Sequence, residues 1–370
     1  MSDTQRRYRE VRKALNNLYP FHADGHLAQH LNTLTAMICG IIGSQKTNLP
    51  QMASKAPGNG ILRESLIKRF SRLVNNDKID QALYFLPYTR ALIRCLCGVD
   101  LTLVIDGSAV GRACGALVIS VVYKKRALPI AFLVRSGNKG HFEETDHLQL
   151  VERIYPFVPQ EVSVTFLGDG EFDGVRLLER LDKYGWRYVC RTAKNSLIDT
   201  GFNTSQLQEY SIFPGCHRHF ENIYFTDDAY GPIQAIIWWE KGYQEPLYLV
   251  TNIKNPHQAR ILYQKRFRIE TFFSDTKSRG FHLHKSHLCD PKRIERLMIP
   301  ACLAYIWVVY LGIFAEEAGF VGLIHRKDRC DLSWFQLGLR FLDYFFNEGN
   351  PLPQHCFAWA FHLFRFSVRY

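Results

Sequence analysis

The first stretch of the chain is defined by apolar residues that recur at helical spacing. They return every three to four positions in segments 27–42, 61–74 and 79–96, which predicts three helices. A segment rich in Gly and Pro separates the first two and leaves room for one short helix. We therefore predict that residues 1–98 form a helical region.

After this region the pattern changes to short β-rich runs that alternate with helical ones. Segments 101–108, 116–123 and 128–134 predict three strands, with a tight Lys-rich turn before the third. The helix, strand, helix and strand that follow are expected at 146–158, 162–170, 175–184 and 186–193. The order β-β-β-α-β-α-β is typical of one mixed α/β sheet with an antiparallel start and helices packed on it.

Three further changes of pattern follow the α/β part. Between about residues 195 and 255 short β-like runs alternate with turn residues, which predicts a β-rich insertion. Segment 261–279 contains neither Pro nor Gly and predicts a single uninterrupted helix. The last part of the chain, to Tyr370, is aromatic-rich, with Trp334, Phe335, Phe341, Tyr344, Phe345 and Phe346. It fits a helical core better than a base-stacking surface, and both interpretations stay open.

Segment 297–315 carries no charged residue and is long enough to suggest a membrane span. Pro300, Tyr305 and Tyr310 interrupt its apolar run, and the sequence has no second segment of this kind. We therefore predict a buried core helix here and no membrane partner.

Composition and charge narrow the class of partner. The chain has 370 residues, of which 47% are hydrophobic and 22% charged, as in globular proteins. Its formal net charge is +11 at pH 7. Residues 1–98 carry 14 basic against 6 acidic side chains, a net of +8, and residues 251–298 carry 11 against 4, a net of +7. Two basic blocks that flank a near-neutral middle indicate a polyanion held at two places, for which nucleic acid is the usual candidate.

The cysteines indicate the compartment. The chain has 10 of them, scattered along its length, with Cys95 and Cys97 as the only close pair. The polar, Arg-rich N-terminus carries no secretory signal. We therefore predict a reduced, cytoplasmic protein whose thiols mostly pack as small apolar groups.

Two aspartates are the first candidates for chemistry. Asp106 and Asp169 stand at the ends of the first and fourth predicted strands. Ligands of open α/β sheets gather at the carboxyl ends of strands, and two carboxylates placed there repel unless a divalent cation lies between them. The alternative is that each Asp only begins a turn, since a Gly follows both.

The predicted helix at 261–279 carries a second set of candidates. At about 100° per residue, Tyr263, Arg266, Glu270 and Lys277 fall within roughly 60° of one another on one face. A carboxylate among cations suits a phosphate-handling site, in which Glu270 binds a metal ion and the two cations bind phosphate oxygens. The alternative is a solvated face with ordinary ion pairs.

The order Asp106, Asp169, Glu270, with the last on a helix after an insertion, resembles the ribonuclease H-like fold of DDE transposases. The spacing Tyr263-x2-Arg266-x3-Glu270-x6-Lys277 is similar to the Y-R-E-K signature of one branch of bacterial insertion-sequence transposases. The long gap between Asp169 and Glu270 is similar to the branch in which a β-rich domain is inserted there.

The resemblance implies a domain organisation. We expect a helical, basic, DNA-binding domain at 1–98, a catalytic core in two parts at 99–195 and 256–320, a β-rich insertion at 196–255 and a helical C-terminal region at 321–370. DNA is the implied partner, both as terminal inverted repeats and as target, and the implied assembly on DNA is a homodimer. The implied localisation is the cytoplasm of a bacterium, at the nucleoid.

The resemblance also implies a mechanism with two Mg²⁺ ions, for which Mn²⁺ substitutes. Asp106 would bridge both ions, and Asp169 and Glu270 would each complete one. Arg266 and Lys277 would bind phosphates near the cut, Tyr263 would position that strand, and either Trp238 or Trp239 would stack on a flipped base. The 3′-OH freed by cleavage would form a hairpin on the opposite strand before it is joined to target DNA.

Several alternatives stay open. Glu171 and Asp173 are rival carboxylates just beyond Asp169. The protein as a whole is alternatively a DNA-binding derivative that no longer cuts, or another ribonuclease H-like nuclease that does not join strands.

Overall fold

Ten strands form one sheet in the computed structural model, which describes residues 2–19, 23–58, 60–96, 100–137, 142–326 and 330–349. Their order across the sheet is β3-β2-β1-β4-β5-β10-β9-β8-β6-β7. The first five strands of the chain are β1 (Leu101–Gly111), β2 (Cys114–Tyr123), β3 (Arg126–Ser136), β4 (Val164–Gly168) and β5 (Arg187–Arg191).

The sheet begins with antiparallel pairs and continues with parallel ones. β3, β2 and β1 are antiparallel neighbours, whereas β1, β4 and β5 run parallel. The crossovers are made by α7 (Glu144–Ile154), with a 3-10 turn at Tyr155–Phe157, and by α8 (Val175–Lys183). The predicted order β-β-β-α-β-α-β is confirmed, and the almost unbroken burial of β1, β2 and β3 agrees with helices on both faces.

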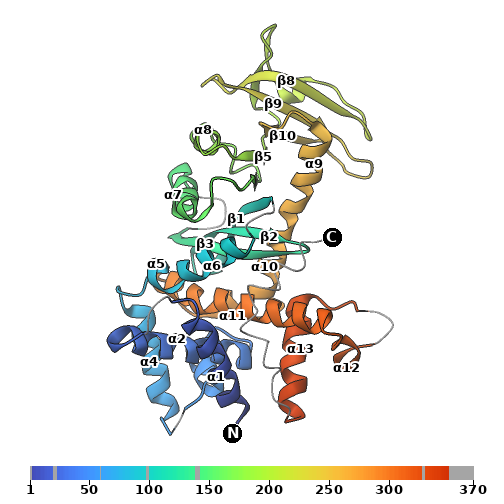
Figure 1. Ribbon diagram of the computed structural model, residues 1–370. Helices are drawn as coiled ribbons and strands as arrows, with labels where there is room; N and C mark the ends of the chain where they lie inside the picture. Colours follow the sequence, from blue (N-terminus) through green and yellow to red (C-terminus); the bar gives the residue numbers. More distant parts are fainter. Residues whose placement is uncertain are drawn as a thin grey trace.

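The segment after β5 extends the same sheet. It contains β6 (Leu197–Asp199), β7 (Thr204–Gln206), β8 (His217–Phe225), β9 (Tyr230–Trp238) and β10 (Leu247–Thr251). β10 pairs antiparallel with β5, so hydrogen bonds join these strands to the central ones. Figure 1 shows β8, β9 and β10 at one end of the molecule, as an outgrowth of the central sheet.

The N-terminal part is helical, as predicted. Its helices are α1 (Asp3–Asn16), α2 (Gly25–Ser44), α3 (Leu49–Lys55), α4 (Arg63–Asn75), α5 (Gln81–Tyr84) and α6 (Leu86–Cys95). The prediction of one helix over 79–96 is wrong, because the chain breaks at Phe85 and begins a new helix with Pro87 in its first turn. Proline fits the start of a helix, where its missing N–H leaves no hydrogen bond unmade.

Helix α11 (Pro291–Glu317) lies between the sheet and the N-terminal helices (Figure 1). It contacts β3 on one side and α2 on the other. By length and composition it is the one helix of the described chain apolar enough to cross a membrane, yet 94% of its most apolar window is buried inside the structure. The prediction of a buried core helix at 297–315 is confirmed.

Helices α12 (Val321–Ile324) and α13 (Trp334–Asn347) follow. The aromatic side chains of α13 that were predicted to close a core are largely buried, with Phe335 and Phe341 fully so. The part of the predicted C-terminal region from residue 350 onward lies outside the described residues, as does the predicted boundary at 98 and 99. The domain boundaries stay predictions.

Candidate active site

Two aspartates lie side by side where two central strands cease to pair. The parallel ladder between β1 and β4 ends at Val104 and Leu167. Asp106 lies just beyond it on β1, and Asp169 directly follows β4, so both carboxylates lie at one edge of the ladder. The prediction that Asp106 ends its strand is wrong, because β1 stays paired with β2 and continues to Gly111. The carboxylates are nevertheless at the edge where open α/β sheets bind ligands.

The guanidinium of Arg266 lies among three carboxylates. Its Nη1 is 3.7 Å from Asp106 Oδ2 and 3.9 Å from Asp169 Oδ2, and its Nη2 is 3.7 Å from Glu270 Oε1. These distances are those of ion pairs and are longer than hydrogen bonds. Carboxylates repel one another at short range, so the shared cation offsets part of that cost. The structure therefore brings the three predicted carboxylates together around one arginine.

The three carboxylates differ in depth. The side chain of Asp106 is 8% exposed, that of Asp169 31% and that of Glu270 58%. The Arg266 side chain is 10% exposed, close to the value for Asp106. Asp106 is therefore the most enclosed of the three carboxylates, and Glu270 is the one most accessible to a ligand.

The helical segment that carries Arg266 is not the single helix predicted. Helix α9 (Pro256–Gln264) is followed by a 3-10 turn at Lys265–Phe267 and then by α10 (Arg268–Thr276), and the three continue as one rod in Figure 1. A 3-10 turn winds more tightly than an α-helix, at about 3.0 residues per turn, so it changes which side chains share a face. The prediction of one uninterrupted helix over 261–279 is therefore wrong at 265–267 and again beyond Thr276.

Lys277 reaches the site by a different route from the one predicted. It caps α10 with non-helical angles, φ −107° and ψ −106°, and so leaves the helix face. Its Nζ donates a hydrogen bond to Ser108 Oγ at 2.6 Å. Ser108 lies two residues after Asp106 on β1, and alternate residues of a strand face the same side. Lys277 is therefore held on the same face of β1 as the Asp106 carboxylate.

Tyr263 is placed beneath this group. Its side chain is only 3% exposed, and the Arg266 guanidinium lies 5.8 Å from the centre of its ring. Burial raises the pKa of its phenol, against the nearby cations Arg266 and Arg191. Tyr263 thus packs against Arg266 on the buried side of the site, and its predicted contact with DNA stays a prediction.

The rival carboxylates Glu171 and Asp173 are engaged elsewhere. Glu171 Oε1 accepts a hydrogen bond from the backbone N–H of Phe142 at 3.1 Å. Burial raises the pKa of Asp173, and a hydrogen bond with Thr192 opposes that shift. Asp169, by contrast, lies within ion-pair distance of the central arginine. This geometry favours Asp169, whose role stays a prediction.

The two base-stacking candidates have different surroundings. The Trp238 ring stacks on His217, with 4.6 Å between ring centroids and 11° between planes, and the Arg260 guanidinium lies 4.5 Å from its centroid. The indole N–H of Trp239 donates to the backbone carbonyl of Tyr243 at 2.9 Å. Three side chains, those of His217, His257 and Arg260, already engage the ring of Trp238. This favours Trp239 as the residue that stacks on a base, and that role stays a prediction.

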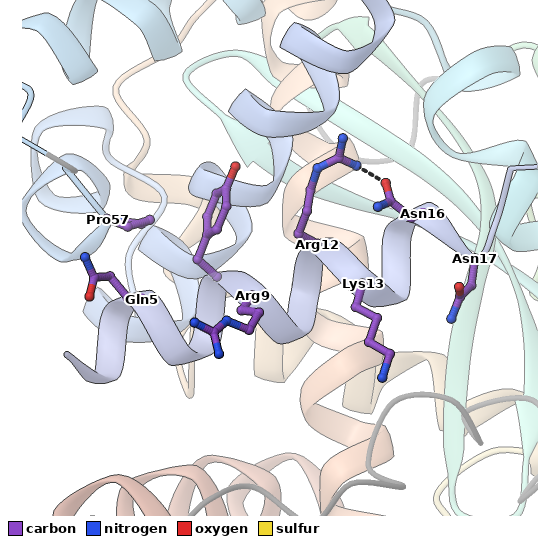
Figure 2. Close-up of a pocket in the computed structure, with 8 residues that line it drawn as sticks. Gln5, Arg9, Arg12, Lys13, Asn16, Asn17 and Pro57 are labelled. Carbon is purple, nitrogen blue, oxygen red and sulfur yellow. Dashed lines mark hydrogen bonds between the residues drawn. The ribbon is translucent and has the colours of Figure 1, made fainter. Parts of the chain in front are cut away.

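A basic hollow lies along α1 in the N-terminal region (Figure 2). It has a volume of about 630 Å³, and its basic lining residues are Arg9, Arg12 and Lys13. The Nε of Arg12 donates to Asn32 Oδ1 at 2.8 Å, which fixes this side chain against α2. Figure 2 shows Arg9 and Lys13 turned away from Arg12. The hollow adds a cationic surface to the predicted DNA-binding region.

The donor set at the three carboxylates suits a divalent cation. Carboxylate oxygens are the hard ligands that Mg²⁺ and Mn²⁺ prefer. Within the described part of the chain, no three His, Cys, Asp or Glu side chains are already close enough to bind one ion. Asp106, Asp169 and Glu270 are instead spread around Arg266, at 3.7 to 3.9 Å. The residues fit a metal ion once the guanidinium moves aside.

His147 on α7 is a buried residue near the site that the sequence does not single out. It is 2% exposed, and its ring centroid lies 4.6 Å from that of Phe172, in the turn that begins with Asp169. Neither ring nitrogen has a hydrogen-bond partner among the described residues. Burial lowers its pKa to about 4, against the attraction of Asp146 and Asp169. In the sequence it is one polar residue of an amphipathic helix, which carries no signal for a site.

The buried imidazole predicts stability that declines in acid. Because its folded pKa of about 4 lies below the ordinary value of 6.5, the unfolded chain binds the proton more readily between these values. We expect this group to lower the free energy of unfolding by about 2 kcal/mol between pH 7.5 and pH 5. Urea unfolding at both pH values measures the slope, and His147→Leu should lose this part of it. A variant with the slope of the wild type would contradict the assignment.

Comparison with protein families matches more than half of the chain. The family model described as Transposase DDE domain matches residues 103–307, from β1 into α11, and includes the three carboxylates. The mixed sheet, with an acidic cluster at the edge of its central strands, defines a ribonuclease H-like α/β protein. The chain belongs to the DDE transposase family. Its membership of the bacterial branch with the Y-R-E-K signature stays a prediction.

One solved structure similar to the chain is described as "Cryo-EM structure of piggyBac transposase synaptic complex with hairpin DNA (SNHP)". The two are 12% identical in sequence with a TM-score of 0.43, over 98% of this chain and 82% of that chain. A search of curated proteins finds no match.

Proposed function

We propose that this transposase cleaves the two ends of its own insertion sequence and joins them to target DNA by a cut-and-paste, two-metal phosphodiester mechanism. The observation that carries the proposal is the convergence of Asp106, Asp169 and Glu270 on Arg266, in a chain of the DDE transposase family. With metal ions bound, these residues would hold a substrate phosphate between the carboxylates and the cation.

Asp106, Asp169 and Glu270 would together hold two divalent cations. The bound ions supply Lewis-acid activation of the attacking oxygen and offset the charge on the phosphate. Arg266 would turn from the carboxylates to the phosphate oxygens, which it can bind through two parallel N–H groups. Its present ion pairs of 3.7 to 3.9 Å are loose enough to be exchanged for such contacts.

Two further side chains would position the strand. Lys277, held on Ser108 at 2.6 Å, would place its ammonium group beside the phosphate next to the cut. The buried Tyr263 ring, which packs against the Arg266 side chain, would fix the position of the guanidinium in the site. Trp239, or failing it Trp238, would stack on a base flipped from the duplex.

The proposed reaction is a series of transfers at phosphorus. Water attacks the phosphodiester at the end of the element and leaves a 3′-OH on the element and a 5′-phosphate on the flank. That 3′-OH attacks the opposite strand, which forms a hairpin and frees the flank. Water reopens the hairpin, and the restored 3′-OH attacks target DNA. Each step breaks one phosphodiester bond as it forms another, or consumes one water, so no covalent bond to the protein is needed.

The proposed partners follow from charge and topology. The N-terminal block and the block at 251–298 would bind the backbone of the terminal repeats, because each carries a large excess of cations. Two ends cut together require two active sites, so we propose a homodimer on DNA. The proposed place of action is the bacterial cytoplasm, at the nucleoid.

One experiment tests the whole proposal. Purified protein and Mg²⁺ are incubated with end-labelled DNA from the two flanks of the gene and with a target plasmid. We expect cleavage at the ends of the element, hairpin-ended fragments and labelled products joined to the plasmid. Binding without cleavage would indicate a silent DNA-binding derivative. Cleavage without joining would indicate another ribonuclease H-like nuclease.

A further inference from the structure

A small cavity forms where the N-terminal helices meet the loop that follows the Glu270 helix. Its volume is about 170 Å³, and its lining residues are Lys46, Thr47, Asn48, Gln51, His282, Lys285 and His287. Lys46, Thr47 and Asn48 come from the turn between α2 and α3, and Gln51 comes from α3 itself. The other three come from a loop more than 200 positions later in the chain. Two segments far apart in sequence thus build one hollow.

The two segments are fixed to each other. Thr47 is 1% exposed, and its Oγ1 donates a hydrogen bond to the backbone carbonyl of His282 at 3.3 Å. His282 has a positive φ of 52°, which turns the loop sharply, and Lys285 N–H donates back to the same His282 carbonyl at 2.8 Å. The loop then makes a 3-10 turn at Leu283–Lys285. One hydrogen bond therefore joins the two segments, and a second one holds the turn of the loop.

The charges of the cavity all have one sign. Within the described part of the chain, neither the lysines nor the histidines that line it form an ion pair with an Asp or Glu. Burial lowers the pKa of His282, and the charged neighbours that lower it further are Lys46, Lys285 and His284. The Nδ1 atom of His282 is buried and has no hydrogen-bond partner among the described residues. The cavity therefore has donors and positive charge and lacks an internal anion.

The positive field continues from the cavity to the candidate active site. His284 lies in the same loop. Burial is the main cause that lowers its pKa, and the positive charges of Lys285 and Lys277 lower it further. Lys277 is in turn bound to Ser108 on the strand that carries Asp106. Cations thus run from Lys46 past Lys285 to the edge of the carboxylate cluster.

We propose that the cavity is a phosphodiester-binding site, in which Lys46 and Lys285 hold one backbone phosphate of the DNA and join the N-terminal helices to the catalytic region. The choice of DNA as ligand rests on the proposed function. A monoanionic phosphodiester suits the cavity because two ammonium groups, the Asn48 and Gln51 amides and the His282 ring surround a small volume. The site makes DNA binding by one segment depend on the position of the other.

The salt dependence of DNA binding tests the site. Each phosphate that a protein neutralises contributes about 0.9 to the slope of log affinity against log salt concentration. We expect Lys46→Gln and Lys285→Gln each to reduce that slope by up to about 1, and the double variant to reduce it by about 1 as well, because both lysines share one phosphate. A loss of about 2 in the double variant would mean two separate contacts, and an unchanged slope would mean none. Either result overturns the proposal.

Controls separate charge, folding and the source of the phosphate. Lys183→Gln removes an exposed lysine of α8, outside both basic blocks, and should leave the slope unchanged. Inorganic phosphate should raise the melting temperature of the wild type and have less effect on Lys46→Gln and on Lys285→Gln. This measurement needs no DNA, so it tests the cavity even if the protein fails to cut the ends of an element. A phosphate effect combined with unchanged DNA binding would assign the site to a free phosphate ligand and overturn the assignment to DNA.

Discussion

Replacement of Asp106 by Asn is expected to reduce DNA cleavage by more than about 100-fold while DNA binding is retained. Loss of a group that only orients a metal ligand costs about 10- to 100-fold, so loss of the central ligand should cost more. Asp106 has the most buried carboxylate of the three, at 8% exposed. The asparagine side chain has nearly the same shape as that of aspartate, so the fold should be unchanged. Cleavage of end-labelled DNA and a gel-shift assay on the same protein measure the two effects.

The neighbouring carboxylates provide matched controls. Asp169→Asn should behave like Asp106→Asn, because both side chains lie within 4 Å of Arg266, at 3.9 and 3.7 Å. Glu171→Gln and Asp173→Asn remove the same charge a few residues away and should keep most of the cleavage activity. The assignment fails if one of these two controls abolishes cleavage and Asp169→Asn does not. Removing an anion beside Arg266 should also leave DNA binding equal or slightly tighter, since the guanidinium loses a competitor of the phosphate.

Local patterns predicted the elements of the fold but not the long-range pairing. The strands at 101–108 and 162–170 follow from short apolar runs between turn residues, and β1 and β4 occupy these places. The segment at 196–255 is recognisable as β-rich for the same reason. Its attachment to the central sheet through β10 and β5 is a non-local pairing, and no local pattern specifies the partner of a strand.

The sequence predicted where the backbone places the site residues, but it did not predict the contacts of their side chains. Parallel neighbouring strands bring Asp106 and Asp169 to one edge, and the sequence order shows this. The position of Arg266 among the carboxylates depends on a 3-10 turn and on side-chain direction, which helical spacing does not describe. The hydrogen bond from Lys277 to Ser108 likewise depends on where α10 ends. Helical spacing therefore grouped the right residues for a reason that is only partly correct.

Replacement of Gly338 by Ala is expected to lower the free energy of unfolding by about 3 kcal/mol or more. Gly338 lies on α13 where this helix crosses α11 (Figure 1), and an added Cβ would lie 1.9 Å from the backbone oxygen of Val308 and 3.0 Å from the backbone nitrogen of Gly312. Helix propensity alone favours Ala over Gly by about 1 kcal/mol, so the two effects have opposite signs. The clash should dominate because its partners are backbone atoms of a buried helix, which no change of rotamer can move. Urea unfolding measures the difference.

Gly43 gives the matched control for this argument. It is also a helical glycine, on α2, but a Cβ there would first meet the flexible tip of Arg7, at 2.6 Å from Nη1, and then Lys55 Cβ at 3.1 Å. The closest contact is the far end of a long side chain and not backbone, so Gly43→Ala should change the free energy of unfolding by no more than about 1 kcal/mol in either direction. If both variants lost the same stability, the loss at Gly338 would not come from the backbone contact between α11 and α13. If Gly338→Ala were as stable as the wild type, α11 and α13 would have to lie further apart than is implied by the 1.9 Å between the added Cβ and the Val308 oxygen.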